Sequence, residues 1–120
     1  MMQNPPRIDG KRPIMALLDL LSQRWVLRLL WELGAGARTS RALRDATAIS
    51  PTVLQARLDA LRAARIVALE KGIGYRLTPV GEELIGAFAP LYAFASDWAQ
   101  VVGVQSEPPA GPAERAGAAG

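Results

Sequence analysis

The stretch AISPTVLQARLDALRAARIV (48–67) restricts the fold of this chain more than any other segment. It contains leucines at helical spacing, which predict the buried side of a helix: Leu54, Leu58 and Leu61. Ser50 suits a helix N-cap and Pro51 the first helical position, so we expect a helix over about 51–64. The side opposite the leucines is small and lightly charged: Thr52, Ala56, Asp59 and Ala63. Such a slim face suits close approach to another molecule.

Two further patterns indicate a winged helix-turn-helix around this segment. Before it, RALRDAT predicts a short helix capped by Thr39 or Ser40, and TAIS forms a tight connection. After it, residues 66–69 and 75–77 are typical of paired strands, with the glycine-bearing turn KGIG between them. A helix pair followed at once by a hairpin is suited to inserting its second helix into a DNA major groove.

Helices are also predicted on both sides of this unit. Pro13 begins one that has apolar residues on a single side, and Ser22 is a candidate cap for a second, QRWVLRLLWEL. Pro79 begins a long last helix, which Pro90 should kink or split. The apolar residues of that helix spread wider than one core-facing stripe, so we expect two copies of the chain to pair through it.

These elements define the expected fold class and domain organisation. The chain should be mainly α with a small β-hairpin (α+β), a winged helix-turn-helix with N- and C-terminal dimerisation helices. We expect a flexible N-terminal arm over residues 1–12 and the domain over 13–104, with its dimerisation helix at 79–102. Residues 105–120 are rich in Pro, Gly and Ala and should form a disordered tail.

Composition argues against catalytic and metal chemistry. The 120 residues include no cysteine and no histidine, which removes thiolates, the usual zinc ligands and the commonest general base. We therefore expect no enzyme activity, no cofactor and no metal site. No apolar run approaches the ~18 residues of a membrane span and no signal peptide is recognisable, so we expect a cytoplasmic protein without membrane contact.

Charge is divided unevenly along the chain. Residues 1–78 contain 13 Lys and Arg against 6 Asp and Glu, a net charge of +7, whereas residues 79–120 contain 1 against 5, a net charge of −4. A basic part favours a polyanion such as double-stranded DNA. A chance asymmetry of a solvated surface explains the charge division alone equally well.

The predicted DNA contacts lie on the helix pair and on the hairpin. Gln55 can form two hydrogen bonds with adenine, and Ala56 can touch a thymine methyl group. Asp59 should repel phosphate unless it accepts from cytosine or lies too far along the helix to matter. Free N–H groups at 51–53 would bind a phosphate, and arginines would hold the DNA backbone, with guanine as an alternative for Arg57. The predicted set is Arg38, Ser40, Arg41, Arg44, Ser50, Thr52, Val53, Gln55, Ala56, Arg57, Lys71 and Arg76.

The predicted dimer interface combines the first and the last helix. It comprises Ile14, Leu17, Leu18, Phe88, Leu91, Tyr92, Ala95, Trp98 and Val102. Burying a large apolar side chain contributes roughly 1.5–3 kcal/mol, so a few of them would make association favourable. A two-fold dimer would hold its two groove-binding helices about one DNA turn, ~34 Å, apart.

Three segments resemble the HxlR-type winged-helix regulators of bacteria, which are relatives of the MarR type. They are LLDLLSQRWVLRLLWEL, ISPTVLQARLDALRAARIV and YRLTPVGEEL, and the resemblance covers roughly residues 12–102. It implies a homodimeric transcription factor in which the fourth helix and the wing contact DNA. The first and the last helix would form the dimer interface.

The chain departs from this family in two places. Family members often have a cysteine just before the proline that opens the first helix and use it to sense oxidants or electrophiles. This chain has Arg12 before Pro13, which excludes thiol sensing at that position. The wing segment LEKGIGYRL is also short and lacks the longer proline-bearing tip that is common in the family.

Two alternatives stand beside a sequence-specific DNA-binding regulator. The lightly charged helix face and the short wing also suit a protein–protein interaction module, an adaptor or anti-repressor without specific DNA binding. The other alternative is a regulator with a small-molecule effector, bound in a cavity near the dimer interface. Aromatic residues could line that cavity: Trp25, Trp31, Tyr92 and Trp98.

Overall fold

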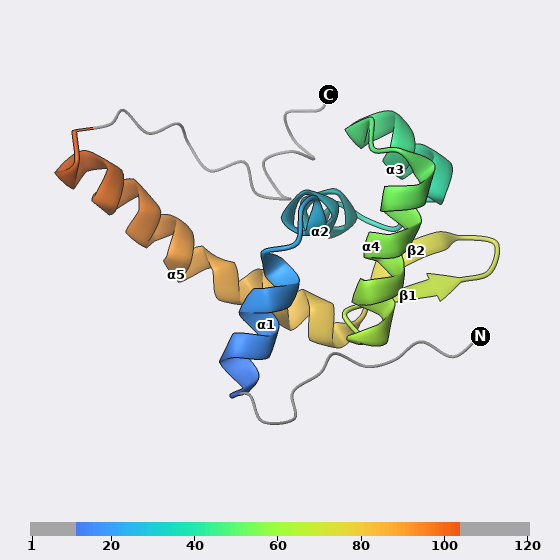
Figure 1. The fold of residues 1–120 in the computed structure, drawn as a ribbon, viewed down its shortest axis with the longest axis horizontal. Helices are drawn as coiled ribbons and strands as arrows, with labels where there is room; N and C mark the ends of the chain where they lie inside the picture. Colours follow the sequence, from blue (N-terminus) through green and yellow to red (C-terminus); the bar gives the residue numbers. More distant parts are fainter. Residues whose placement is uncertain (1–11, 104–120) are drawn as a thin grey trace.

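The computed structural model describes residues 12–103, so the expected tail and all of the expected arm except Arg12 lie outside the described residues. The elements are, in order, α1 (Pro13–Leu21), α2 (Val26–Gly34), α3 (Ser40–Thr47), α4 (Pro51–Ala63), β1 (Val67–Glu70), β2 (Gly74–Leu77) and α5 (Pro79–Val101). This order, drawn in Figure 1, confirms the predicted winged helix-turn-helix of α+β class.

The core is built around α2, which contacts α1, α3, α5 and β2. The largest fully buried side chains come from three helices: Val26, Leu29, Leu30, Leu43, Leu54, Leu58 and Leu61. The leucine side predicted for the helix at 51–64 is therefore confirmed. Because each buried leucine stabilises the fold by roughly 1.5–3 kcal/mol, α4 is held firmly by this side. On the opposite side Thr52 and Ala56 are exposed, and Asp59 and Ala63 are half-buried.

Local capping sets the geometry of the helix pair. The hydroxyls of Thr39 and Ser50 accept hydrogen bonds from the backbone N–H groups three residues further on, at 3.1 and 3.4 Å. Pro51 occupies the first position of α4, as predicted. At the end of α3, the buried Thr47 hydroxyl donates to the carbonyl oxygen of Leu43 at 2.7 Å. These bonds satisfy helix ends and fix where each helix begins and ends.

The start of α2 differs from the prediction. Ser22 ends α1, and its hydroxyl donates to the carbonyl oxygen of Asp19 at 2.9 Å, so its predicted role as the cap of the second helix is wrong. α2 begins only at Val26, after Trp25 with φ of 79°. A bulky residue adopts this left-handed conformation when its surroundings require it. Here the side chain of Trp25 packs against the core, which is a tertiary constraint.

The hairpin is extended by a contact that the sequence did not predict. β1 and β2 pair in antiparallel register with Val67 opposite Leu77. In addition, Arg38 exchanges two backbone hydrogen bonds with Tyr75, at 2.9 and 2.8 Å. Gly74 permits this approach, because a Cβ atom there would lie 2.6 Å from the Arg38 carbonyl oxygen. The wing is thus joined to the segment that leads into α3.

α5 is a single helix from Pro79 to Val101, so of the two predicted effects of Pro90, a kink or a split, the split is wrong. The residue four positions earlier, whose carbonyl group a proline ring crowds, is Gly86. The C-terminal half of α5 extends away from the wing (Figure 1). None of the described helices has the combination of length and apolar character that crossing a membrane requires.

Candidate nucleic-acid interface

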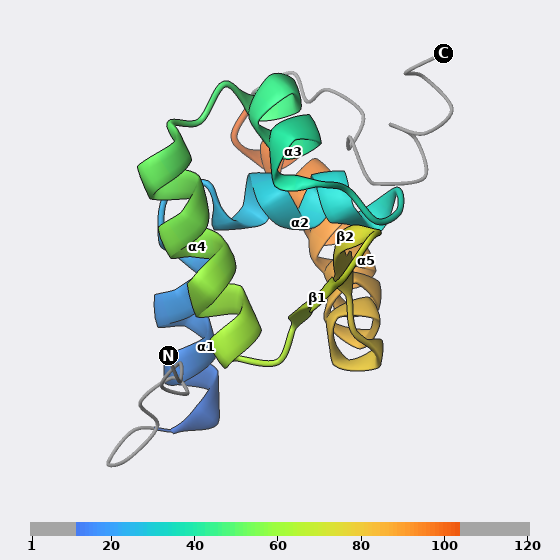
Figure 2. The same cartoon turned by 90° about the vertical axis from the view of Figure 1, so that its right-hand side faces the viewer.

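The outer side of α4 faces solvent at one end of the molecule. In Figure 2 this helix lies at the front, with α3 above it and the hairpin beside it. Contacts of α4 with α3 and with β1 hold the three elements together. Thr52, Gln55 and Ala56 are exposed on α4. The structure therefore brings together a slim helix face and two flanking elements, as the sequence predicted.

The N-terminus of α4 offers fewer backbone donors than predicted for residues 51–53. Pro51 has no N–H, and the N–H of Val53 already donates to the Ser50 hydroxyl. The N–H of Thr52 forms no hydrogen bond among the described residues. One backbone donor therefore remains for a phosphate at this helix end. The side chain of Val53 is half-buried and packs against the core, so it faces inward rather than toward a ligand.

Gln55 and Asp59 form a hydrogen-bonded pair on the outer side of α4. The Nε2 group of Gln55 donates to Oδ1 of Asp59 at 2.8 Å, one helical turn away. Gln55 is exposed and Asp59 is half-buried. Their spacing of four residues along a helix is the sequence signal that could have predicted this pair.

Arg57 has a partner inside the protein. Its Nε donates to the carbonyl oxygen of Arg24 at 2.8 Å and connects α4 to the turn between α1 and α2. The guanidinium of Arg24 stacks over the ring of Trp25, with its central carbon 4.9 Å from the ring centre. Arg24 is exposed and was not in the predicted set. Only the fold places this turn beside α4, so no sequence pattern around residue 24 could have revealed it.

The exposed arginines of α3 have no ion-pair partner among the described residues. Arg41 and Arg44 take part in none of the ion pairs found among residues 12–103, and the same is true of Arg24. Ser40 is exposed at the first position of α3. Because these guanidinium groups need not break an existing pair to bind an anion, they are the strongest candidates for phosphate contacts.

Arg38, in contrast, belongs to a network around a buried carboxylate. Glu32 is 4% exposed. Its Oε2 atom lies 3.0 Å from Nε of Arg28, and its Oε1 atom lies 3.9 Å from Nε of Arg38. Arg28 also donates to the carbonyl oxygen of Ala46 at 2.9 Å, close to the C-terminus of α3. The network ties α2 to both ends of α3 and positions the helix pair.

The two predicted basic residues of the wing have different surroundings. Lys71 is exposed in the turn between the strands. Nε of Arg76 lies 3.0 Å from Oε1 of Glu70 on the neighbouring strand. Lys71 is thus available at the tip, whereas Arg76 is held on the strands by its carboxylate partner.

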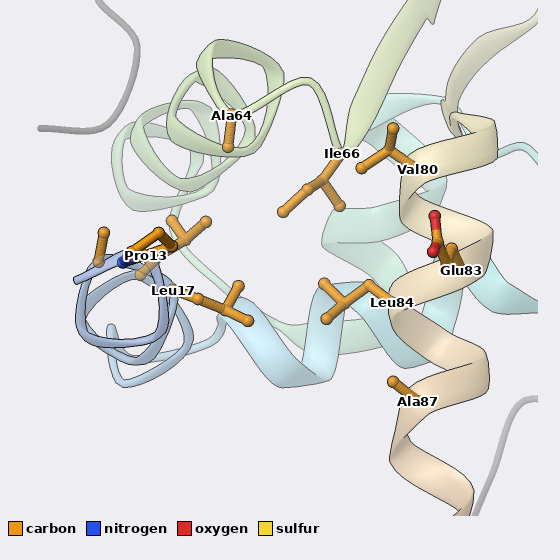
Figure 3. A pocket seen from close by; sticks show the side chains of 10 residues that line it. Pro13, Leu17, Ala64, Ile66, Val80, Glu83, Leu84 and Ala87 are labelled. Carbon is orange, nitrogen blue, oxygen red and sulfur yellow. The ribbon is translucent and has the colours of Figure 1, made fainter. Parts of the chain in front are cut away.

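A second surface, on α1 and along α5 to its C-cap, is apolar. The predicted interface residues Ile14, Leu18, Leu91, Ala95, Trp98 and Val102 are exposed, and Leu17, Phe88 and Tyr92 are half-buried. An open pocket of about 370 Å³ lies between α1, the end of α4 and α5. Figure 3 shows Leu17 and Leu84 approaching each other from two sides of this pocket, with Ala64 and Ile66 at its other edge.

The predicted cluster of aromatic residues is partly present. The rings of Trp31 and Tyr92 are stacked, with centres 4.9 Å apart, and Phe88 meets Trp31 edge-on. Partial burial raises the pKa of the Tyr92 phenol above its usual value. A hollow of about 200 Å³ beside these rings is lined by neither Trp25 nor Trp98. The four aromatic side chains therefore do not line one common cavity.

Comparisons with known proteins agree with this arrangement. A sequence profile described as HxlR-like helix-turn-helix matches residues 20–102. A search among curated proteins returned no significant match.

Solved structures include several similar chains. Quinone-bound YodB from B. subtilis is 27% identical, with a TM-score of 0.67 over 72% of this chain and 98% of that one. A possible HxlR family transcriptional factor from Thermoplasma volcanium GSS1 is 26% identical, with a TM-score of 0.61 over 74% of this chain and 86% of that one. The transcriptional repressor BigR from Xylella fastidiosa is 27% identical, with a TM-score of 0.58 over 68% of this chain and 85% of that one.

Proposed function

The chain belongs to the HxlR-like helix-turn-helix family and is a DNA-binding transcription regulator, and we propose that it binds specific DNA sequences as a homodimer. In this proposal α4 enters the major groove and the hairpin lies near the adjacent minor groove. The proposed dimer forms through α1 and α5.

The observation that carries the proposal is the two-sided character of α4. Its leucine side is fully buried, while Thr52, Gln55 and Ala56 on the other side are exposed. A major groove about 12 Å wide admits one helix. The small side chains of Thr52 and Ala56 allow the helix to approach the base edges closely, where the longer Gln55 can reach them.

The charge around α4 supports contact with the DNA backbone. Arg41 and Arg44 on α3 and Arg24 beside α4 form no ion pair among the described residues, and Lys71 is exposed on the wing. Each phosphate that such a cation neutralises releases counterions and strengthens binding at low salt. In this proposal Arg57 and Arg38 act mainly by holding the fold, because both are engaged within the protein.

The apolar surface supports association of two copies. Leu91 and Trp98 are 60% and 55% exposed on α5, Val102 directly after that helix is 51% exposed, and Ile14 is 54% exposed on α1. Contiguous large apolar side chains on a surface are characteristic of an interaction site. A two-fold arrangement would place two copies of α4 on one side of the DNA, about 34 Å apart.

Gel-shift titration with the DNA upstream of the gene, across a salt series, tests this function. We expect specific binding whose logarithmic affinity falls linearly with the logarithm of salt concentration. Gln55→Ala should relax base preference with little change in the salt slope, whereas Arg44→Ala should weaken binding to all sequences and reduce the slope by about 1. Absence of binding to every duplex at low salt would refute the proposal.

A further inference from the structure

We infer that Asp59 is a positioning residue for base recognition, which holds the Gln55 side-chain amide in the orientation that selects adenine over guanine. This inference rests on the proposed function, since it concerns how α4 distinguishes bases. It assigns a purpose to a carboxylate that otherwise weakens binding to a polyanion. The carrying observation is the 2.8 Å hydrogen bond from Nε2 of Gln55 to Oδ1 of Asp59.

The chemistry of the two side chains determines the orientation. A carboxylate only accepts hydrogen bonds, so it attracts the NH₂ group of Gln55 and repels the amide oxygen. Rotation of the amide by half a turn would place that oxygen against Asp59. The pair therefore has one favoured arrangement, with Nε2 toward Asp59.

This arrangement leaves the recognition edge of the amide intact. The NH₂ group has two hydrogens, and in this proposal Asp59 takes the one that points away from Oε1. The other hydrogen and Oε1 lie on the same edge and can together address a base. Adenine presents an acceptor and a donor on its major-groove edge and matches this edge, whereas guanine presents two acceptors, one of which would face the amide oxygen.

Sequence selection from a randomised duplex pool, using the full-length protein, tests the inference. The wild-type protein should select an adenine that Gln55→Ala no longer requires. Asp59→Asn keeps the shape but can bond to either amide orientation, so it should lower the adenine-to-guanine preference at that position by at least about 5-fold. Asp45→Asn is the matched control, because it removes an exposed charge from α3 without touching Gln55 and should leave the preference unchanged.

The outcomes separate this inference from the proposed function. Failure of the wild-type protein to select any sequence contradicts the proposed function. Selection by the wild-type protein, with an unchanged base preference in Asp59→Asn, refutes only the role of Asp59. An equal loss of preference in Asp45→Asn also refutes it, since charge alone would then account for the effect. In a Gln55→Ala background, Asp59→Asn should change nothing at this position, and a further change would likewise overturn the inference.

Discussion

Arg57 in the middle of α4 donates a hydrogen bond from Nε to the backbone oxygen of Arg24, 2.8 Å away in the turn between α1 and α2. The bond uses the backbone of Arg24 and leaves its guanidinium exposed, stacked on Trp25. The guanidinium of Arg24 therefore lies beside α4, although the two are far apart in the sequence. In the proposed complex this cation faces the DNA backbone.

Substitution of Arg24 by alanine should weaken binding to all DNA sequences equally. The substitution keeps the carbonyl group that Arg57 uses, so it removes the charge without releasing α4. Loss of one phosphate contact should reduce the salt slope by about 0.9. Fluorescence anisotropy titrations at several salt concentrations measure the slope. Arg62→Ala serves as the control, because Arg62 lies in the last turn of α4, away from the N-terminal half of the helix that is proposed to enter the groove. An Arg24→Ala slope no smaller than that of the control would exclude the contact.

Glu32 should be important for stability rather than for DNA contact. Its removal by Glu32→Ala leaves Arg28 and Arg38 without their carboxylate, although water can solvate both because their side chains are 38% and 36% exposed. We therefore expect a loss of about 1–3 kcal/mol in the free energy of unfolding. Urea denaturation measures this loss. As a control, Glu83→Gln changes an exposed residue and should alter the free energy of unfolding by less than about 0.5 kcal/mol. An equal effect of both variants would contradict the structural role of Glu32.

Gly74 should tolerate alanine much less well than Gly72. Both have positive φ, 119° and 82°, but only at Gly74 would a Cβ atom collide with the backbone of Arg38, at 2.6 Å from its carbonyl oxygen. Gly72→Ala should lose about 1 kcal/mol from conformational strain alone. Gly74→Ala should lose more and should also speed amide hydrogen exchange at Arg38 and Tyr75. Equal losses in the two variants would show that the bridge between these residues is unimportant.

Leu91 should be essential for dimer formation. The side chain is 60% exposed on α5, and Leu91→Glu would place a charge in the proposed interface. Because a symmetric dimer loses two leucines, the dissociation constant should rise by about 100-fold or more. Sedimentation equilibrium measures this constant. Gln100→Glu adds the same charge to an exposed position of α5 and should leave the dimer intact, whereas a monomeric wild-type protein at micromolar concentration would contradict the interface.

Local signals were sufficient to predict much of this fold. Ser50 and Pro51 define the start of α4 through interactions within four residues, and the leucine spacing identifies its buried side. Ser22 shows the limit of such reasoning. A serine can cap either end of a helix, and Ser22 lies at the end of α1. The start of α2 is displaced to Val26 by the packing of Trp25 against the core, which no capping pattern in the sequence indicates.

The candidate site was predictable in its elements but not in its pairings. The exposed face of α4 follows from helical periodicity, and the basic residues of α3 follow from composition. The partners of Arg57 and Arg38 lie 33 and 6 residues away and depend on how the helices pack. Such pairings decide which arginines hold the fold and which are available to DNA, and only the three-dimensional arrangement separates the two groups.

The most direct test of the account is interference by 7-deazapurines incorporated into the selected DNA site, which lack the N7 acceptor of the major groove. We predict two clusters of positions at which the substitution weakens binding, with centres about 10–10.5 base pairs apart, as two copies of α4 in successive major grooves require. If the substitution left the binding affinity unchanged at every position, or weakened binding at one cluster of positions alone, the account would be contradicted.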